Sequence, residues 1–194
     1  MAILYGIGIF SAFYLHPMGR NIGLIIVFPI LILYTPLLKG IPLIGNIVVA
    51  TALGIVFLFT EAALTGKIQL LFIPFFLAFG LSFIRELIKD VEDMEGDNHN
   101  SLRTFPNMFG IPATVSLLRV GTILLCGVAI LPWIQGWYGL YYLILLILTV
   151  ELPLIYTCFF HLNIGSEINT FSQAASWLKV ITVAGMVVIL SMGI

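Results

Sequence analysis

Apolar residues dominate the chain in seven long stretches, which short polar segments separate. A helix needs about 20 mostly apolar residues to cross the hydrocarbon core of a bilayer, and most of these stretches come close to that length. The stretches are residues 1–16, 22–38, 41–59, 68–84, 111–133, 138–160 and 174–190. The pattern predicts an all-α, polytopic membrane protein with about seven transmembrane helices, which form a single domain over residues 1–194.

The composition supports a protein that is solvated by lipid. Hydrophobic residues make up 61% of the chain, charged residues only 9%, and the mean hydropathy is +1.16. Soluble domains carry about a quarter charged residues, because a folded surface must face water. The net charge is -1 and no basic run occurs, which argues against a nucleic-acid partner.

The distribution of lysine and arginine predicts the orientation in the membrane. If the seven stretches cross in alternation, six basic residues fall on one side and two on the other. The six are Lys39, Arg85, Lys89, Arg103, Arg119 and Lys179, and the two are Arg20 and Lys67. Basic residues accumulate on the cytoplasmic side. We therefore expect the polar segment 85–104 to face the cytoplasm of a bacterial or archaeal cell.

Acidic residues concentrate in this polar segment. Six of the nine acids lie between Glu86 and Asp97. Glu86, Asp90, Asp93 and Asp97 follow one another at intervals of four, three and four residues, which places them on one face of a helix. Like charges at these intervals destabilise a helix, so a counter-charge is expected beside them.

Carboxylates in this arrangement suit a hard cation. Magnesium is usually held by one or two carboxylates together with the phosphates of a substrate. Lys89 and Arg85 occupy the adjacent face and can reach phosphate oxygens. The segment therefore indicates a magnesium-diphosphate site. Two other interpretations are a solvated acidic loop and a cation-transport site, although transport carboxylates are expected in the middle of a helix.

The same residues resemble a known family. The pair Asp93-x-x-x-Asp97 is similar to the second aspartate-rich motif of the UbiA superfamily of intramembrane prenyltransferases. Downstream, Arg103-Thr-Phe-Pro106 and Gly110 resemble the element that follows this motif. Phe105 stands where the family commonly has leucine.

Two further segments extend the resemblance. Residues 34–39 and 43–46 are similar to the tyrosine-and-lysine loop of the superfamily, and residues 84–97 are most similar to its geranylgeranylglycerol-phosphate geranylgeranyltransferase branch. The resemblance implies transfer of a geranylgeranyl group from a prenyl diphosphate to geranylgeranylglyceryl phosphate, a step of ether-lipid synthesis. An aromatic acceptor, as in quinone biosynthesis, is the alternative within the superfamily.

The resemblance also implies roles for individual residues. Asp93 and Asp97 are the expected catalytic ligands of Mg²⁺, and Asp90 and Glu86 are weaker candidate ligands. The expected substrate contacts are Arg85, Lys89, Arg103, Lys39, Tyr34 and Asn46. The implied partners are a prenyl diphosphate donor, a lipid or aromatic acceptor and the membrane lipids.

One large departure separates the chain from the family pattern. The superfamily has nine helices and a first motif, N-x-x-x-D-x-x-x-D, after its second helix, and this sequence shows neither that motif nor the first two helices. The seven stretches then correspond to helices three to nine, as in a carboxy-terminal portion whose activity alone is not assured. A membrane cation transporter and a non-catalytic membrane subunit remain the alternatives of other classes.

Two more acidic residues lie within apolar stretches. Glu61 is expected at the membrane interface, close to Lys67. Glu151 lies in the middle of its stretch, where a carboxylate is a functional candidate by default, although the sequence offers it no partner.

Overall fold

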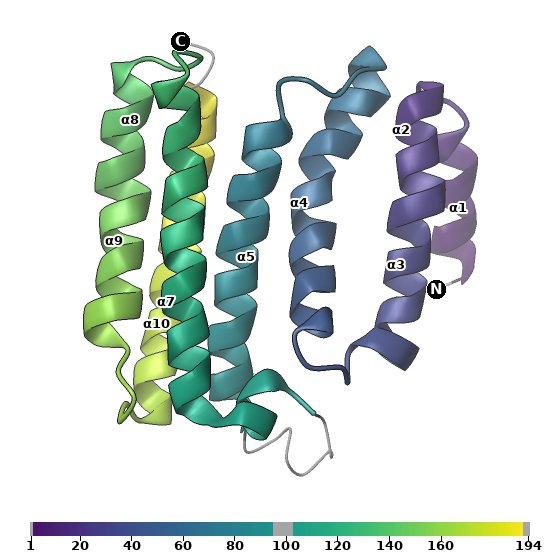
Figure 1. Ribbon diagram of the computed structural model, residues 1–194. Helices are drawn as coiled ribbons and strands as arrows, with labels where there is room; N and C mark the ends of the chain where they lie inside the picture. The colour runs from purple at the N-terminus through teal and green to yellow at the C-terminus, as the bar shows by residue number, and fades with distance from the viewer. Residues whose placement is uncertain (1, 95–102, 192–194) are drawn as a thin grey trace.

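The computed structural model describes residues 2–94 and 103–191, and every regular element in these ranges is helical. Figure 1 shows the helical segments standing side by side and running alternately up and down. The prediction of an all-α chain is confirmed.

Each of the seven predicted stretches coincides with one helical segment, and two of these segments contain π-helical turns. The elements are α1 (Ala2–Ala12), α2 (Pro17–Asn21), η1 (Ile22–Val27), α3 (Phe28–Leu33), η2 (Tyr34–Leu38), α4 (Ile44–Thr65), α5 (Phe72–Glu92), α7 (Phe105–Ile134), α8 (Leu140–Leu146), η3 (Ile147–Glu151), α9 (Leu152–Ile155), η4 (Tyr156–His161) and α10 (Ile168–Leu190). The run from α2 to η2 is continuous, as is the run from α8 to η4.

Four segments of the described chain are long and apolar enough to cross a membrane: Ile44–Thr65, Phe105–Ile134, Leu140–His161 and Ile168–Leu190. A shorter apolar helix covers Pro17–Leu33. Helix α5 carries its charged residues in its second half, and α1 has 11 residues, roughly 16 Å at about 1.5 Å per residue. The chain is therefore an integral membrane protein with several apolar helices, and the number of seven crossings stays a prediction.

The connections between helices separate into two ends. In Figure 1 the turn between η2 and α4, the end of α5 and the start of α7 all lie at the lower end. The turns from α1 to α2 and from α4 to α5 lie at the upper end. Lys39 and Arg103 belong to the lower connections, Lys67 belongs to the upper connection from α4 to α5, and Arg20 lies in the short helix α2, next to the upper turn from α1 to α2. This grouping agrees with the predicted orientation; which end faces the cytoplasm stays a prediction.

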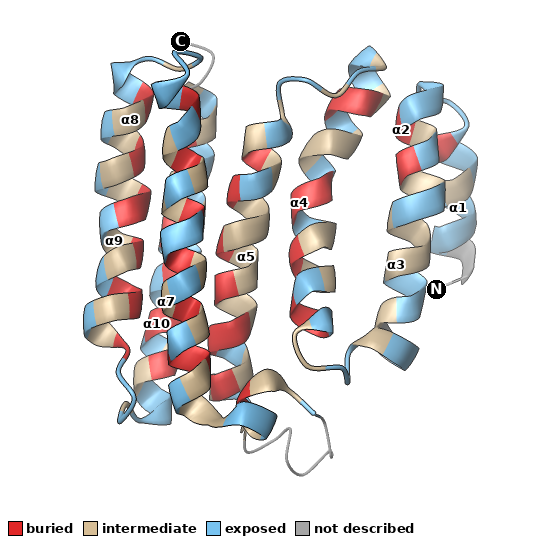
Figure 2. Cartoon of the chain, in the orientation of Figure 1, coloured by how far each residue is buried: buried red, intermediate tan, exposed pale blue. Residues whose placement is uncertain are grey.

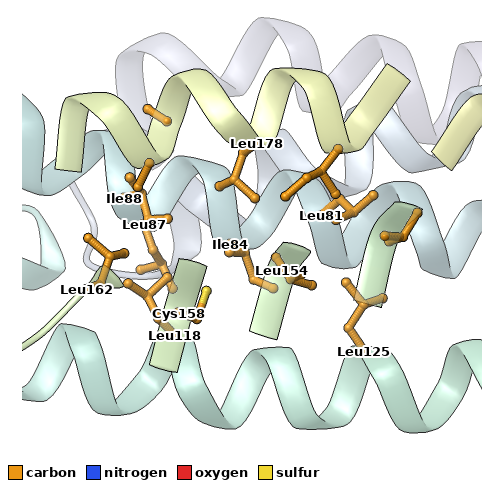
Figure 3. Packing of buried hydrophobic residues seen from close by; sticks show 14 of the residues in the cluster. Leu81, Ile84, Leu87, Ile88, Leu118, Leu125, Leu154, Cys158, Leu162 and Leu178 are labelled. Carbon is orange, nitrogen blue, oxygen red and sulfur yellow. The ribbon is translucent and has the colours of Figure 1, made fainter. Parts of the chain in front are cut away.

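Helix α5 lies at the centre of the packing. It contacts α4 on one side and both α7 and α10 on the other, and the buried residues of these helices face one another (Figure 2). Figure 3 shows the resulting core between α5, α7, the α9–η4 run and α10. Its labelled residues are Leu81, Ile84, Leu87, Ile88, Leu118, Leu125, Leu154, Cys158, Leu162 and Leu178.

Glu61 joins α4 to α5 and is buried, with 6% of its surface exposed. Its carboxylate accepts backbone hydrogen bonds from Gln69 (3.0 Å), Leu70 (2.8 Å) and Leu71 (3.0 Å). These amides lie just before the first turn of α5, where N–H groups lack partners within the helix. Glu61, which the sequence predicted at the membrane interface, therefore connects α4 to the start of α5 and positions the two helices relative to each other.

Glu151 is also buried, with 6% of its surface exposed, and its Oε1 atom has no hydrogen-bond partner among the described residues. A buried polar atom without a partner costs about 1–3 kcal/mol. We therefore expect Glu151→Leu to raise the free energy of unfolding by about that amount, because an apolar side chain of similar volume removes the cost. Thermal unfolding in detergent tests this; a lower midpoint than in the wild type would show that the carboxylate has a stabilising partner.

Candidate active site

A polar cavity of about 200 Å³ lies at the lower end, between the η2–α4 turn, the end of α5 and the start of α7. Eleven residues line it: Tyr34, Lys39, Ile41, Pro42, Gly45, Asn46, Glu86, Lys89, Asp90, Asp93 and Thr104. Three carboxylates and two lysine ammonium groups meet there. Segments that are more than 60 residues apart in the sequence, from Tyr34 to Thr104, therefore contribute to one site.

The acidic wall of the cavity belongs to the last turns of α5. Glu86, Asp90 and Asp93 follow at intervals of four and three residues, and all three line the cavity. On the opposite side of the helix, Leu87 and Ile88 are completely buried in the core. Burial of this apolar side fixes the rotation of the helix about its axis, so the carboxylates must face the cavity.

Asn46 positions one of these carboxylates. Its Nδ2 atom donates a hydrogen bond of 2.8 Å to Oδ2 of Asp90, from the first turn of α4 to the end of α5. The side chain of Asn46 is buried, with 7% exposed. The sequence predicted Asn46 as a substrate contact, which stays a prediction; the structure shows that Asn46 holds an acidic residue of the site.

The basic residues divide into those that line the cavity and those that do not. Lys89 Nζ lies 4.0 Å from Asp93 Oδ2, and Lys39 lines the cavity from the η2–α4 turn. Arg85 forms an ion pair of 2.8 Å with Glu86 but does not line the cavity. Arg103 is exposed and also lies outside the lining. The two lysines are therefore the cations best placed for a phosphate in the cavity.

Two residues that carry a hydroxyl group line the cavity. Tyr34 lies in η2, the last part of the continuous run from α2 to η2, and its phenol is a hydrogen-bond donor. Thr104 Oγ1 is buried and has no hydrogen-bond partner among the described residues. Both groups can donate to an anionic ligand.

The turn before α4 brings backbone close to the site. Leu43 has a φ of 63°, which non-glycine residues rarely adopt, and it precedes the first turn of α4. A Cβ atom on Gly45 would lie 3.4 Å from the carbonyl oxygens of Leu38 and Lys39. This is an ordinary van der Waals distance, so the turn that carries Lys39 packs directly against the first turn of α4. Gly110, with a φ of 81°, marks the kink near the start of α7.

The lining residues fit magnesium if a ligand shares the ion. Among the described residues, no group of three or more His, Cys, Asp or Glu side chains is arranged to hold a metal ion by itself. The cavity still offers carboxylate oxygens next to ammonium groups. This donor set suits a magnesium ion that takes one or two carboxylates and completes its coordination with phosphate and water.

Most of the predicted site residues meet in this cavity. Seven of them line it: Tyr34, Lys39, Asn46, Glu86, Lys89, Asp90 and Asp93. Asp97 lies outside the described residues, and Arg85 and Arg103 are not part of the lining. Thr104 lines the cavity but was not among the predicted site residues, although it stands beside Arg103 in the motif of residues 103–106.

The bond between Asn46 and Asp90 yields a testable expectation. Removing a hydrogen bond that orients a metal ligand typically costs 10- to 100-fold in metal affinity. We expect Asn46→Ala to raise the Mg²⁺ concentration needed for half-maximal diphosphate binding about 10-fold or more, because Asp90 loses its fixed orientation. A magnesium titration measures this, with Thr51→Ala on the same helix as the control; an unchanged midpoint would contradict the positioning role.

An aromatic stripe continues the acidic face of α5 into the apolar region. Phe75, Phe79 and Phe83 follow at intervals of four residues, and successive ring centroids are 6.2 Å apart. Phe79 and Phe83 also line an apolar groove of about 230 Å³ between α5 and α7. Glu86 follows Phe83 by three residues, so one side of α5 passes from aromatic to acidic.

Comparison with known proteins points to one family. The model of the UbiA prenyltransferase family matches residues 1–177. The digeranylgeranylglyceryl phosphate synthase of Haloquadratum walsbyi is 38% identical over 120 residues, which cover 60% of this chain and 41% of that protein. The protein of the same description from Methanosphaera stadtmanae is 31% identical over 178 residues, which cover 92% of this chain and 64% of that protein.

A solved structure has the same arrangement of helices. It is described as giving structural and mechanistic insights into the biosynthesis of digeranylgeranylglyceryl phosphate synthase in membranes. The TM-score is 0.85 at 26% sequence identity, and the match covers 98% of this chain and 67% of that one. The chain spans less than half the length of the first curated relatives that it matches, with 42% of the Natronomonas pharaonis protein covered.

Proposed function

Because the chain belongs to the UbiA prenyltransferase family, we propose that its polar cavity binds a prenyl diphosphate with Mg²⁺ and supports prenyl transfer to a second lipid. The observation that carries this proposal is the single cavity in which Glu86, Asp90 and Asp93 meet Lys39 and Lys89. Its carboxylates suit magnesium, and its lysines suit phosphate oxygens.

Each lining group has a part in holding the donor. Asp90 and Asp93, with Glu86 as a further ligand, would hold the magnesium ion. Lys39 and Lys89 would contact the diphosphate directly. When bound, the ion neutralises negative charge on the departing diphosphate and so lowers the barrier to ionisation. Asp97 is proposed to join this set, as the motif that it shares with Asp93 implies.

The hydroxyl groups of Tyr34 and Thr104 add neutral donors to the same site. Donors aimed at oxygens that gain charge in the transition state contribute electrostatic stabilisation. In the transfer, the bond between C1 of the prenyl group and the diphosphate oxygen breaks, and the electron pair leaves with the diphosphate. The acceptor hydroxyl oxygen would then bond to C1, and its proton would pass to the released diphosphate.

The aromatic stripe is proposed to hold the prenyl chain. Phe79 and Phe83 begin one turn above Glu86 on the same helix. A donor whose diphosphate lies between Asp90 and Lys89 can therefore extend its chain along these rings. Apolar walls also keep water from the allylic cation, which water would otherwise quench.

We propose geranylgeranylglyceryl phosphate as the acceptor, because residues 84–97 resemble that branch and the relatives carry the corresponding description. The test incubates the detergent-solubilised protein with Mg²⁺, geranylgeranyl diphosphate and two acceptors, geranylgeranylglyceryl phosphate and 4-hydroxybenzoate. Ether-lipid product supports the proposal. If 4-hydroxybenzoate is the only acceptor that becomes prenylated, the result supports prenyl transfer but contradicts the proposed acceptor.

A further inference from the structure

An apolar groove of about 480 Å³ lies between α7 and the α9–η4 run, away from the polar cavity. Its lining residues are Thr122, Ile123, Cys126, Ile155, Phe159 and Phe160. Ile123 is 61% exposed and Phe160 is 69% exposed, so the groove opens on the surface of the helix bundle. In a membrane this surface faces lipid, and none of these residues lines the proposed active site.

Arg119 does not line the groove, but it lies on α7 about one turn before Thr122, which does. Its Nε atom donates to the carbonyl oxygen of Cys158 (3.3 Å), and Nη2 donates to the carbonyl oxygen of Leu162 (3.3 Å) and to Asn163 Oδ1 (3.5 Å). Its guanidinium carbon is 5.6 Å from the ring centroid of Phe159, which lines the groove. The bonds to the last turn of η4 fix the guanidinium at the end of that helix.

The charge of Arg119 has no protein counter-charge in the described part of the chain. The ion pairs there are Arg85–Glu86 and Lys89–Asp93, and no carboxylate comes within 4.0 Å of Arg119. Its bonds to Cys158, Leu162 and Asn163 use Nε and Nη2, which leaves Nη1 without a hydrogen-bond acceptor among the described residues. The position at the end of η4, close to where the helix leaves the apolar region, is suited to an anionic headgroup.

We propose that this groove binds an anionic phospholipid of the surrounding bilayer. Its phosphate would accept hydrogen bonds from the guanidinium of Arg119, which forms strong, directional contacts with phosphate. One of its chains would lie along Ile123, Ile155 and Phe159. The volume falls within the range of about 300–1,000 Å³ that is typical of ligand pockets. The bound lipid would bridge α7 and η4.

The test measures retention of defined lipids by native mass spectrometry of the delipidated protein. The probes are phosphatidylglycerol and a diacylglycerol with the same chains but no phosphate. The variants are Ile123→Trp, which fills the mouth of the groove, and Arg119→Gln, which removes the charge. Val183→Trp on α10 is the matched control, because Val183 is 62% exposed and lines no cavity described above.

The proposal expects phosphatidylglycerol to bind at least 10-fold more tightly than diacylglycerol to the wild type. It expects at least a 10-fold loss in Ile123→Trp and in Arg119→Gln, and no change in Val183→Trp. Equal binding of the two lipids would overturn the headgroup contact, and wild-type binding in Ile123→Trp would overturn the groove. If Arg119→Gln fails to fold because η4 loses its contacts, the comparison of phosphatidylglycerol with diacylglycerol and the Ile123→Trp variant still test the proposal.

Discussion

Asp93→Asn is expected to lower magnesium-dependent prenyl transfer by about 100- to 1,000-fold, the usual loss when one group that stabilises transition-state charge is removed. Asparagine keeps the shape of the side chain but removes the negative charge that attracts the cation. The lysine pair would then face the diphosphate without a bound ion. The initial rate of transfer at saturating substrate concentrations measures the effect.

The neighbouring residue supplies the control. Glu92 lies on the same turn of α5, but its carboxylate accepts a hydrogen bond of 2.8 Å from Ser172 and does not line the cavity. Glu92→Gln makes the same change in charge one residue away, so it should leave the rate within about 3-fold of the wild type. Equal losses in the two variants would show that the general acidity of the segment matters and that the cavity does not.

Glu61→Ala is expected to lower the free energy of unfolding by about 3–5 kcal/mol, because three backbone amides before α5 lose their acceptor in a buried place. The loss also removes a negative charge from the amino end of a helix, where it is favourable. Chemical or thermal unfolding in detergent gives the change in stability. The variant should also weaken diphosphate binding at the other end of α5.

A graded series separates this role from general damage. Glu61→Gln keeps one acceptor oxygen and should lose less stability than Glu61→Ala. Thr60→Ala removes only a hydrogen bond to Val56 within α4 and should change the free energy of unfolding by about 0.5 kcal/mol or less. A loss in Thr60→Ala as large as in Glu61→Ala would mean that this end of α4 is sensitive to any change.

The acidic face of α5 could be predicted from the sequence because it depends on local spacing. Glu86, Asp90 and Asp93 share one side of the helix whatever surrounds it, and the apolar residues between them show which side is buried. The seven helical segments follow from the same kind of information, since a bilayer requires long apolar runs.

The other half of the site depends on tertiary packing. Spacing along the chain does not predict that Asn46 meets Asp90, 44 residues away, or that Thr104 lines the cavity. The resemblance brought Tyr34, Lys39 and Asn46 into the candidate set, but it gave no role to Thr104. The sequence distinguished Glu61 from Glu151 only by position, at the membrane interface and in the middle of an apolar stretch. The structure adds that Glu61 accepts three backbone hydrogen bonds, whereas Glu151 Oε1 has no partner among the described residues.

The most direct test of the central claim is a titration of the purified protein with geranylgeranyl diphosphate, in Mg²⁺ and in EDTA, together with Asp90→Asn. It requires binding only and does not depend on turnover. We predict saturable binding in Mg²⁺ that weakens at least 10-fold in EDTA and in the variant. Equal affinity in Mg²⁺ and EDTA, with Asp90→Asn binding like the wild type, would contradict a magnesium-diphosphate site in this cavity.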